Sequence, residues 1–134
     1  MLTKYRKTYK KIAMGLLSFI PGERELKTLQ QTVQRYEEHP DCQLYLLKKE
    51  GDFVGLIGLE IAENHFTVCH ASITPCYRGE GLGHAMVAAV QQLMGARELR
   101  ATAKTEAFLA KCREALPVVR MEKVTLIAEE RQKL

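Results

Sequence analysis

The chain has 134 residues, of which 46% are hydrophobic and 27% are charged, as in an ordinary soluble globular domain. Its net charge of +4 suits an acidic ligand but is too small to indicate a nucleic-acid-binding protein by itself. The four cysteines form no C-x-x-C pair, and no stretch approaches the ~18 consecutive apolar residues of a membrane span, so we expect a cytoplasmic protein without disulfides.

The N-terminal part of the chain predicts a short strand and two helices. Alternating residues over 2–6 favour the strand. Apolar residues recur at helical spacing over 9–20, and Pro21-Gly22 ends that helix. A second helix is expected over 23–38, with acidic residues in its first turn.

Three runs with the character of strands come next. They cover residues 43–49, 53–61 and 65–73, and short polar turns separate them. Because loops this short join strands that are neighbours in a sheet, we expect an antiparallel meander.

The C-terminal part alternates helices and strands. A broad apolar stripe predicts a helix over 82–94, and a strand over 98–102 is expected to return parallel to the third run. A last helix over 105–116 and a last strand over 118–127 follow. This order predicts a single domain (1–134) of the α/β class, with a mixed, mostly antiparallel central sheet flanked by helices.

Three glycines, Gly79, Gly81 and Gly83, alternate just before the helix over 82–94. The first N–H groups of a helix lack partners, and glycines allow close approach, so this turn predicts a phosphate or pyrophosphate site. The absence of a Gly-Lys-Ser/Thr sequence excludes a Walker A loop, and a dinucleotide fingerprint would need glycine where His84 stands. The remaining alternative is a glycine-rich helix start that binds nothing.

The pattern Arg78-x-x-Gly81-x-Gly83, preceded by Ile73-x-Pro75, resembles motif A of the GNAT superfamily of acetyl-coenzyme A-dependent N-acyltransferases. The resemblance covers nearly all of the chain in the order of its elements. It implies a GNAT-type fold, acetyl-CoA as cofactor and an amine as acceptor. The stretch over 11–19 and the helix that contains Cys112 also resemble the small RibT-like acetyltransferases of bacterial riboflavin operons.

The resemblance also implies where the cofactor binds. Strands four and five of such folds part, often beside a bulge in strand four, and admit the pantetheine arm much as a sheet edge admits a peptide strand. The backbone N–H near Ile73 would then polarise the thioester carbonyl. Thr102 stands where many members carry an Asn. The implied cofactor-binding residues are Ala71, Ser72, Ile73, Arg78, Gly79, Glu80, Gly81, Leu82, Gly83 and Thr102.

The catalytic groups of the family are harder to place in this sequence. Many members use a Tyr of the last helix as the proton donor, and the aligned position here is Leu109. His70 is our candidate general base because imidazole titrates near neutral pH; its alternative role is a strand histidine that only bonds a neighbour. Glu60 is a second candidate, with a solvated edge charge as the alternative. Strand alternation would point His65 and His70 to opposite faces, so no metal site is expected.

The sequence favours two functions. The first is an N-acetyltransferase that moves an acetyl group from acetyl-CoA to an amine, by direct attack in a ternary complex. The second is a non-catalytic acyl-CoA-binding or regulatory protein on the same fold. An RNA-binding module is weaker because no RNA-binding motif is present. The expected partners are an unidentified amine acceptor and a second copy in a homodimer, with no nucleic acid and no membrane.

Overall fold

Five strands form one sheet in the computed structural model, which describes residues 1–115. Their order across the sheet is β1-β2-β3-β4-β5. Neighbouring strands are antiparallel except β4 and β5, which run parallel, so the expected meander is confirmed. The strands are β1 (Leu2–Lys4), β2 (Cys42–Lys49), β3 (Asp52–Ile61), β4 (His65–Ile73) and β5 (Glu98–Ala101).

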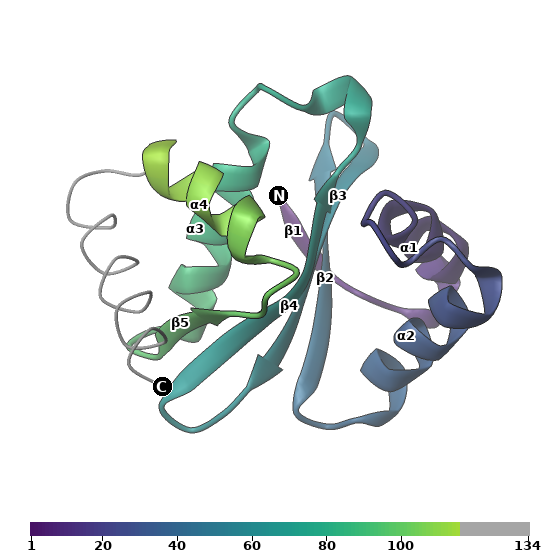
Figure 1. Cartoon of the computed structure of the whole chain (residues 1–134), viewed down its shortest axis with the longest axis horizontal. Coiled ribbons are helices and arrows are strands. Elements are labelled where there is room, and N and C mark those ends of the chain that lie inside the picture. Colours follow the sequence, from purple (N-terminus) through teal and green to yellow (C-terminus); the bar gives the residue numbers. More distant parts are fainter. Residues whose placement is uncertain (116–134) are drawn as a thin grey trace.

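The helices cover both faces of this sheet. Helices α1 and α2 lie on one face and α3 and α4 on the other (Figure 1). Helix α3 joins β4 to the parallel strand β5, which confirms the expected crossover. The α-helices are α1 (Lys10–Leu17), α2 (Leu26–Glu38), α3 (Leu82–Met94) and α4 (Glu106–Ala115), and short 3-10 turns are η1 (Lys7–Tyr9) and η2 (Pro75–Tyr77).

Two hydrophobic clusters hold the helices to the sheet. Leu56 of β3 packs with α1 and α2, whereas its neighbour Ile57 packs with α3 and α4, and both are fully buried. In β4, Phe66 and Val68 face the α3–α4 side. Each fully buried side chain of this size stabilises the fold by ~1.5–3 kcal/mol.

Strand β4 carries a bulge at Cys69. Gly58 of β3 lies opposite His70, and the next residue, Leu59, lies opposite Val68, so Cys69 is the extra residue. The bulge reverses the alternation: Val68 points toward α3, whereas His70 contacts α2. The bulge that the family resemblance implied is therefore present.

Strands β4 and β5 pair over a short length and then part. Their register covers only His65–Val68 against Glu98–Ala101. Beyond this point the hydroxyl of Thr105 donates a hydrogen bond of 2.7 Å to the carbonyl of Val68. Among residues 1–115, the edge of β4 after Val68 consequently has no strand partner on the β5 side, as the resemblance implied.

The ends of several elements differ from the sequence prediction. The first helix stops at Leu17, and the second begins at Leu26 with Glu25 as its N-cap, so Glu23 lies in the α1–α2 connection (residues 18–25). The strand expected over 118–127 lies outside the described residues. Within residues 1–115, no helix is long and apolar enough to cross a membrane.

Candidate functional site

The glycine turn (residues 78–83) follows η2, includes the first two residues of α3, and has two left-handed residues. Gly79 and Gly81 have φ angles of +85° and +78°, which only glycine adopts readily, and Gly81 is the N-cap of α3. No heavy atom lies within 4 Å of an ideal Cβ at either residue. The first hydrogen bond of α3 is donated by Ala85 to the carbonyl of Gly81 at 3.1 Å, so the N–H groups of residues 82–84 precede the helical ladder. The turn therefore offers backbone donors next to open space.

Gly83 has a different role from the other two glycines. A Cβ on Gly83 would lie 3.0 Å from Cζ of Phe108 and 3.4 Å from Sγ of Cys112. The missing side chain lets α4 pack against the first turn of α3. The sequence pattern alone suggests only the approach of a ligand at this glycine.

Arg78 and Glu80 both have partners within the protein. Nε of Arg78 donates to the carbonyl of Ile73 at 3.0 Å, which fastens the glycine turn to the end of β4. The Glu80 carboxylate pairs with Nζ of Lys49 at 2.8 Å on the surface. Lys49 therefore places a second cation beside the turn, one that the sequence analysis did not single out.

Residues 71–73 form the end of β4, beyond its pairing with β5. They pair with β3 on one edge, where Ala71 lies opposite Ile57 and Ile73 opposite Gly55. The side chain of Ser72 is buried and donates a hydrogen bond of 2.7 Å to the carbonyl of Leu16 in α1. Only the backbone of Ser72 is thus free to contact a ligand along the open edge.

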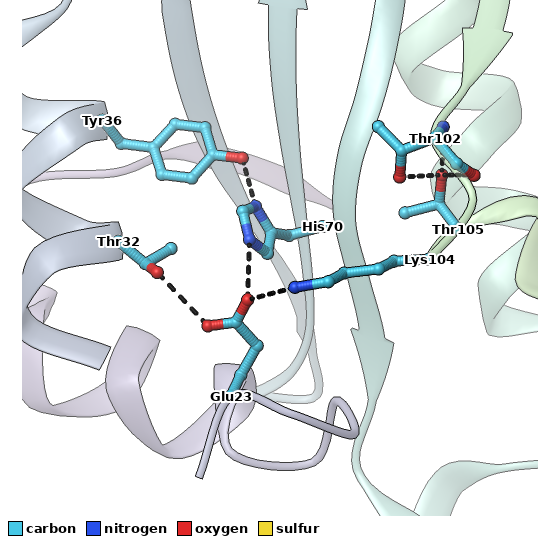
Figure 2. A network of polar contacts seen from close by, with 7 residues as sticks. All are labelled: Glu23, Thr32, Tyr36, His70, Thr102, Lys104 and Thr105. Carbon is cyan, nitrogen blue, oxygen red and sulfur yellow. Dashed lines mark hydrogen bonds and ion pairs between the residues drawn. The ribbon is translucent and has the colours of Figure 1, made fainter. Parts of the chain in front are cut away.

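Thr102 follows β5 and takes part in the start of α4. Its N–H donates to Oγ1 of Thr105 at 3.0 Å, and the two hydroxyls lie 3.2 Å apart. The carbonyl of Thr102 accepts from the N–H of Glu106 at 3.0 Å. Thr102 and Thr105 together fix the point where the strands part (Figure 2).

His70 lies at the centre of a polar network between the sheet and α2, as Figure 2 shows. Its Nδ1 is 2.6 Å from the hydroxyl of Tyr36, and its Nε2 is 3.4 Å from Oε1 of Glu23. The Glu23 carboxylate also accepts from the Thr32 hydroxyl and pairs with Nζ of Lys104, each at 3.3 Å. The network joins α2, the α1–α2 connection, β4 and the turn that follows β5.

The network determines the charge and tautomer of His70. Burial lowers the pKa of the imidazole below its ordinary value of 6.5, and the nearby Glu23 carboxylate only partly opposes this effect. The ring is therefore neutral at pH 7. Burial raises the pKa of the Tyr36 phenol, so that hydroxyl keeps its proton and donates it to Nδ1. In the neutral ring, Nε2 then carries the hydrogen and donates a hydrogen bond to the Glu23 carboxylate. Both ring nitrogens are therefore engaged.

Glu23 is the functional candidate that sequence reasoning missed. It is only 3% exposed, and its carboxylate is held by groups from three separate parts of the chain. Burial of a carboxylate requires partners of this kind. No local signal marks it, because Glu23 follows Pro21-Gly22 and reads as an ordinary acid at a helix start.

The other sequence candidates have structural partners or are inert. Glu60 pairs with Arg35 at 2.9 Å on the surface of α2. Leu109 is buried in the core beside α3. Burial raises the pKa of the Cys112 thiol to about 11, so it stays protonated.

The expected opposition of the two β4 histidines needs correction. The bulge at Cys69 shifts the alternation by one residue, so His65 and His70 fall on the same face by strand parity. The prediction that these two side chains point to opposite faces was wrong. Among the described residues there is still no group of three or more His, Cys, Asp or Glu that could hold a metal ion.

Comparison with known proteins gives a consistent result. A model of the acetyltransferase (GNAT) family matches residues 11–113. An uncharacterized N-acetyltransferase in the lysA 3' region of Bacillus methanolicus is 46% identical over 113 residues, which are 84% of this chain and 94% of that protein.

Solved structures agree at the level of the fold. Aminoglycoside N-acetyltransferase AAC(6')-Iy, solved in complex with CoA, has a TM-score of 0.69 at 15% identity, covering 86% of this chain and 84% of that one. A transcriptional regulator from Bacillus halodurans has a TM-score of 0.66 at 11% identity, covering 86% and 89%. With the family model matching most of its length, the chain belongs to the GNAT acetyltransferase family.

Proposed function

We propose that this protein transfers an acetyl group from acetyl-CoA to a primary amine. The observation that carries the proposal is the parting of β4 from β5 directly beside the glycine turn. A structural relative has been solved with a bisubstrate analogue that joins CoA to an acetylated aminoglycoside. The fold shared with that enzyme supports the same use of the parted strands.

The residues present fit the cofactor. The turn presents left-handed Gly79 and Gly81 and the free amides of the first turn of α3, which suit a pyrophosphate. Lys49 and Arg78 add positive charge near it. The unpaired edge of β4 suits an extended pantetheine arm with amide groups of its own. When bound, acetyl-CoA supplies the activated acetyl group as a thioester.

The polar network suggests how the acceptor loses its protons. In a direct transfer, the amine nitrogen bonds to the acetyl carbon while the carbon–sulfur bond breaks. A protonated amine loses two protons in the process, one to a base and one to the departing sulfur. We propose that Glu23 accepts the first. Because both nitrogens of His70 are engaged, the geometry favours His70 as the residue that positions Glu23 rather than as the base itself.

A second candidate function is a non-catalytic acyl-CoA-binding or regulatory protein. The specific observation in its favour is that Leu109, at the position of the family's usual proton donor, is buried and apolar. The similar fold of the Bacillus halodurans transcriptional regulator is consistent with this candidate. Both functions require the same cofactor site and differ only in turnover.

Two measurements on the purified chain test these functions. Acetyl-CoA at about a hundredfold its dissociation constant should stabilise the fold by ~2.7 kcal/mol, and the thermal midpoint should rise accordingly. Release of free thiol with a panel of amines then separates an enzyme from a binder. Absence of a thermal shift with any CoA thioester would contradict both functions.

The glycine turn can be tested with a matched pair of variants. Gly81→Val should abolish binding of CoA because it adds a side chain at the proposed pyrophosphate site and strains a left-handed residue. Gly95→Val is the control, since Gly95 also has a positive φ and open surroundings but lies at the other end of α3. If both variants bind CoA equally well, the pyrophosphate lies elsewhere.

The chemical identity of the acceptor and the formation of a homodimer are separate proposals, each with its own test. The resemblance of residues 11–19 to RibT-like proteins suggests adding flavin-pathway amines to the panel. Sedimentation at several protein concentrations tests the proposed homodimer.

A further inference from the structure

The Glu23 carboxylate faces a cation across the opening between β4 and β5. Glu23 lies in the α1–α2 connection, and Lys104 lies in the turn that follows β5, 81 residues away along the chain. Figure 2 shows the Lys104 side chain reaching past β4 to the carboxylate. This ion pair joins the α1–α2 connection to the turn that follows β5, and its carboxylate also contacts His70.

We propose that Glu23 forms the subsite for the ammonium group of the acceptor, and that Lys104 occupies this subsite in the free protein. The inference rests on the proposed function and extends it to the class of acceptor. That class is a protonated primary amine on a flexible alkyl chain.

The proposed subsite carries a buried negative charge. The Glu23 side chain is only 5% exposed, and its neighbour His70 is neutral at pH 7. Among the described residues, Lys104 is the one cationic side chain within 4 Å of Glu23. A buried carboxylate without a cation is costly, so a group that displaces Lys104 must itself bring a positive charge.

The Lys104 side chain can leave the Glu23 carboxylate. Its side chain is 60% exposed and makes a single contact of 3.3 Å with the carboxylate. Because this side chain lies mostly in solvent, another cation can take its place, whereas leaving the buried carboxylate without any cation would be costly. The Thr32 and His70 contacts, in contrast, come from part-buried and buried groups and keep the carboxylate in place when Lys104 moves.

The shape of the Lys104 side chain indicates the shape of the acceptor. The present occupant is an ammonium group at the end of an unbranched alkyl chain, so the approach to Glu23 admits such a chain. Two exposed apolar side chains flank Glu23 along the sequence: Phe19 is 38% exposed and Leu26 is 62% exposed. The Phe19 ring lies 6.0 Å from Cζ of Arg78, beside the end of β4.

The position of Glu23 relative to the open edge of β4 also suits an acceptor site. His70 connects Glu23 to β4 one residue before the open edge at residues 71–73. An amine on Glu23 therefore stands beside the strand edge proposed for the pantetheine arm. No other buried carboxylate in the described residues is placed in this way.

The experiment uses the whole chain and 1,5-diaminopentane as the probe. Calorimetric titration measures its affinity with and without saturating CoA. Lys104→Met keeps the chain length but removes the competing charge, and should tighten diamine binding about tenfold. Glu23→Gln should weaken binding about tenfold or more. Lys111→Met, an exposed lysine of α4, and Glu25→Gln, two residues from Glu23, are the matched controls and should leave the affinity unchanged.

The outcomes separate this inference from the proposed function. Affinity for CoA and thiol release report on the proposed function, whereas the diamine titration without CoA reports on Glu23 alone. Lys104→Met removes a side chain that is 60% exposed, and an unaltered diamine affinity in the folded variant overturns the inference. Equal binding of aniline, which is uncharged at pH 7 and has no alkyl chain, also overturns it. Tighter diamine binding in Lys104→Met together with loss in Glu23→Gln supports it.

Discussion

His70 is held between a phenol and a carboxylate, and each of its ring nitrogens has one partner. The sequence could suggest a titratable residue at this position, but it could not show which nitrogen was free. The structure shows that neither is. A histidine in such a position keeps its neighbours oriented, and its own protonation should disturb them.

The first prediction concerns the stability of the fold in acid. Burial lowers the pKa of His70 below 6.5, so as the pH falls the unfolded chain binds this proton before the folded chain does. The contribution of His70 is therefore fully present above pH 6.5 and is lost as the pH falls below it. Urea unfolding at about pH 7.5 and pH 5.5 should show a smaller loss in His70→Gln than in the wild type. The slope from one proton is at most ~1.4 kcal/mol per pH unit.

Groups that titrate in both proteins cancel in this comparison. If His70→Gln loses as much stability as the wild type between the two pH values, the imidazole is not buried in its neutral form.

At the scale of elements, the local pattern predicted most of the fold. The strand over 65–73 and the helix over 82–94 were found with the expected bounds because a repeated spacing of apolar residues identifies each. The start of α2 was placed three residues too early. Glu23 resembles a first-turn acid in the sequence, but long-range partners, His70 and Lys104, hold it outside the helix. Contacts between residues so far apart leave no local signal.

The second prediction concerns the point where β4 and β5 part. Thr105 is 3% exposed, and its hydroxyl bonds both the carbonyl of Val68 and the N–H of Thr102. Thr105→Val keeps the shape of the side chain and leaves these groups unsatisfied, so the free energy of unfolding should fall by ~1–3 kcal/mol. Thr105→Ser keeps the hydroxyl and should lose less. A loss of stability in Thr105→Ser with none in Thr105→Val, measured by urea unfolding, would instead assign the effect to the methyl group.

The third prediction concerns the packing of α3 against α4. Gly83→Val would bring a side chain within 3.0 Å of the Phe108 ring, and this overpacking should cost ~1–3 kcal/mol. Gly15→Ala is the control, because Gly15 is exposed inside α1 with nothing within 4 Å of its Cβ. That variant should gain up to ~1 kcal/mol from helix propensity. Thermal unfolding of both variants measures the contrast, and a neutral Gly83→Val would show that α4 yields easily.

At the scale of the whole molecule, a modest positive charge faces an anionic ligand. The chain carries a net charge of +4, and Lys49 and Arg78 lie beside the glycine turn. Surface charges act over about 10 Å at 0.1 M salt and over less at higher salt. Long-range attraction should therefore assist CoA binding only when the salt concentration is low.

The fourth prediction follows from this charge distribution. CoA affinity should fall several-fold between about 50 mM and 500 mM NaCl, and Lys49→Ala should weaken binding at the lower concentration while reducing the salt dependence. Glu80→Gln is the matched variant, because it frees Lys49 from its 2.8 Å ion pair and should tighten binding. Identical titrations for the two variants would show that Lys49 does not reach the ligand.

The candidate site could be predicted only in part for a related reason. Gly81 and its neighbours predicted the left-handed glycine turn that we propose for the cofactor, because adjacent residues form it. The polar network proposed for the acceptor brings together Glu23, Tyr36, His70 and Lys104, which come from four separate segments. Their meeting depends on how the helices dock on the sheet, and the sequence alone does not specify that docking at the resolution of single side chains.

The bulge at Cys69 has a consequence for the evolution of β4. The strand consists of two segments of opposite parity, one serving the α3–α4 core with Phe66 and Val68 and one serving α1 and α2 with His70 and Ser72. Removing a single residue at this point would turn the imidazole toward the α3–α4 core and move Ile73 to the α1–α2 side. Substitutions within either segment can be accepted one at a time, but the number of residues between Val68 and His70 cannot drift. The length of the strand at this point, as much as its composition, is what brings His70 to Glu23.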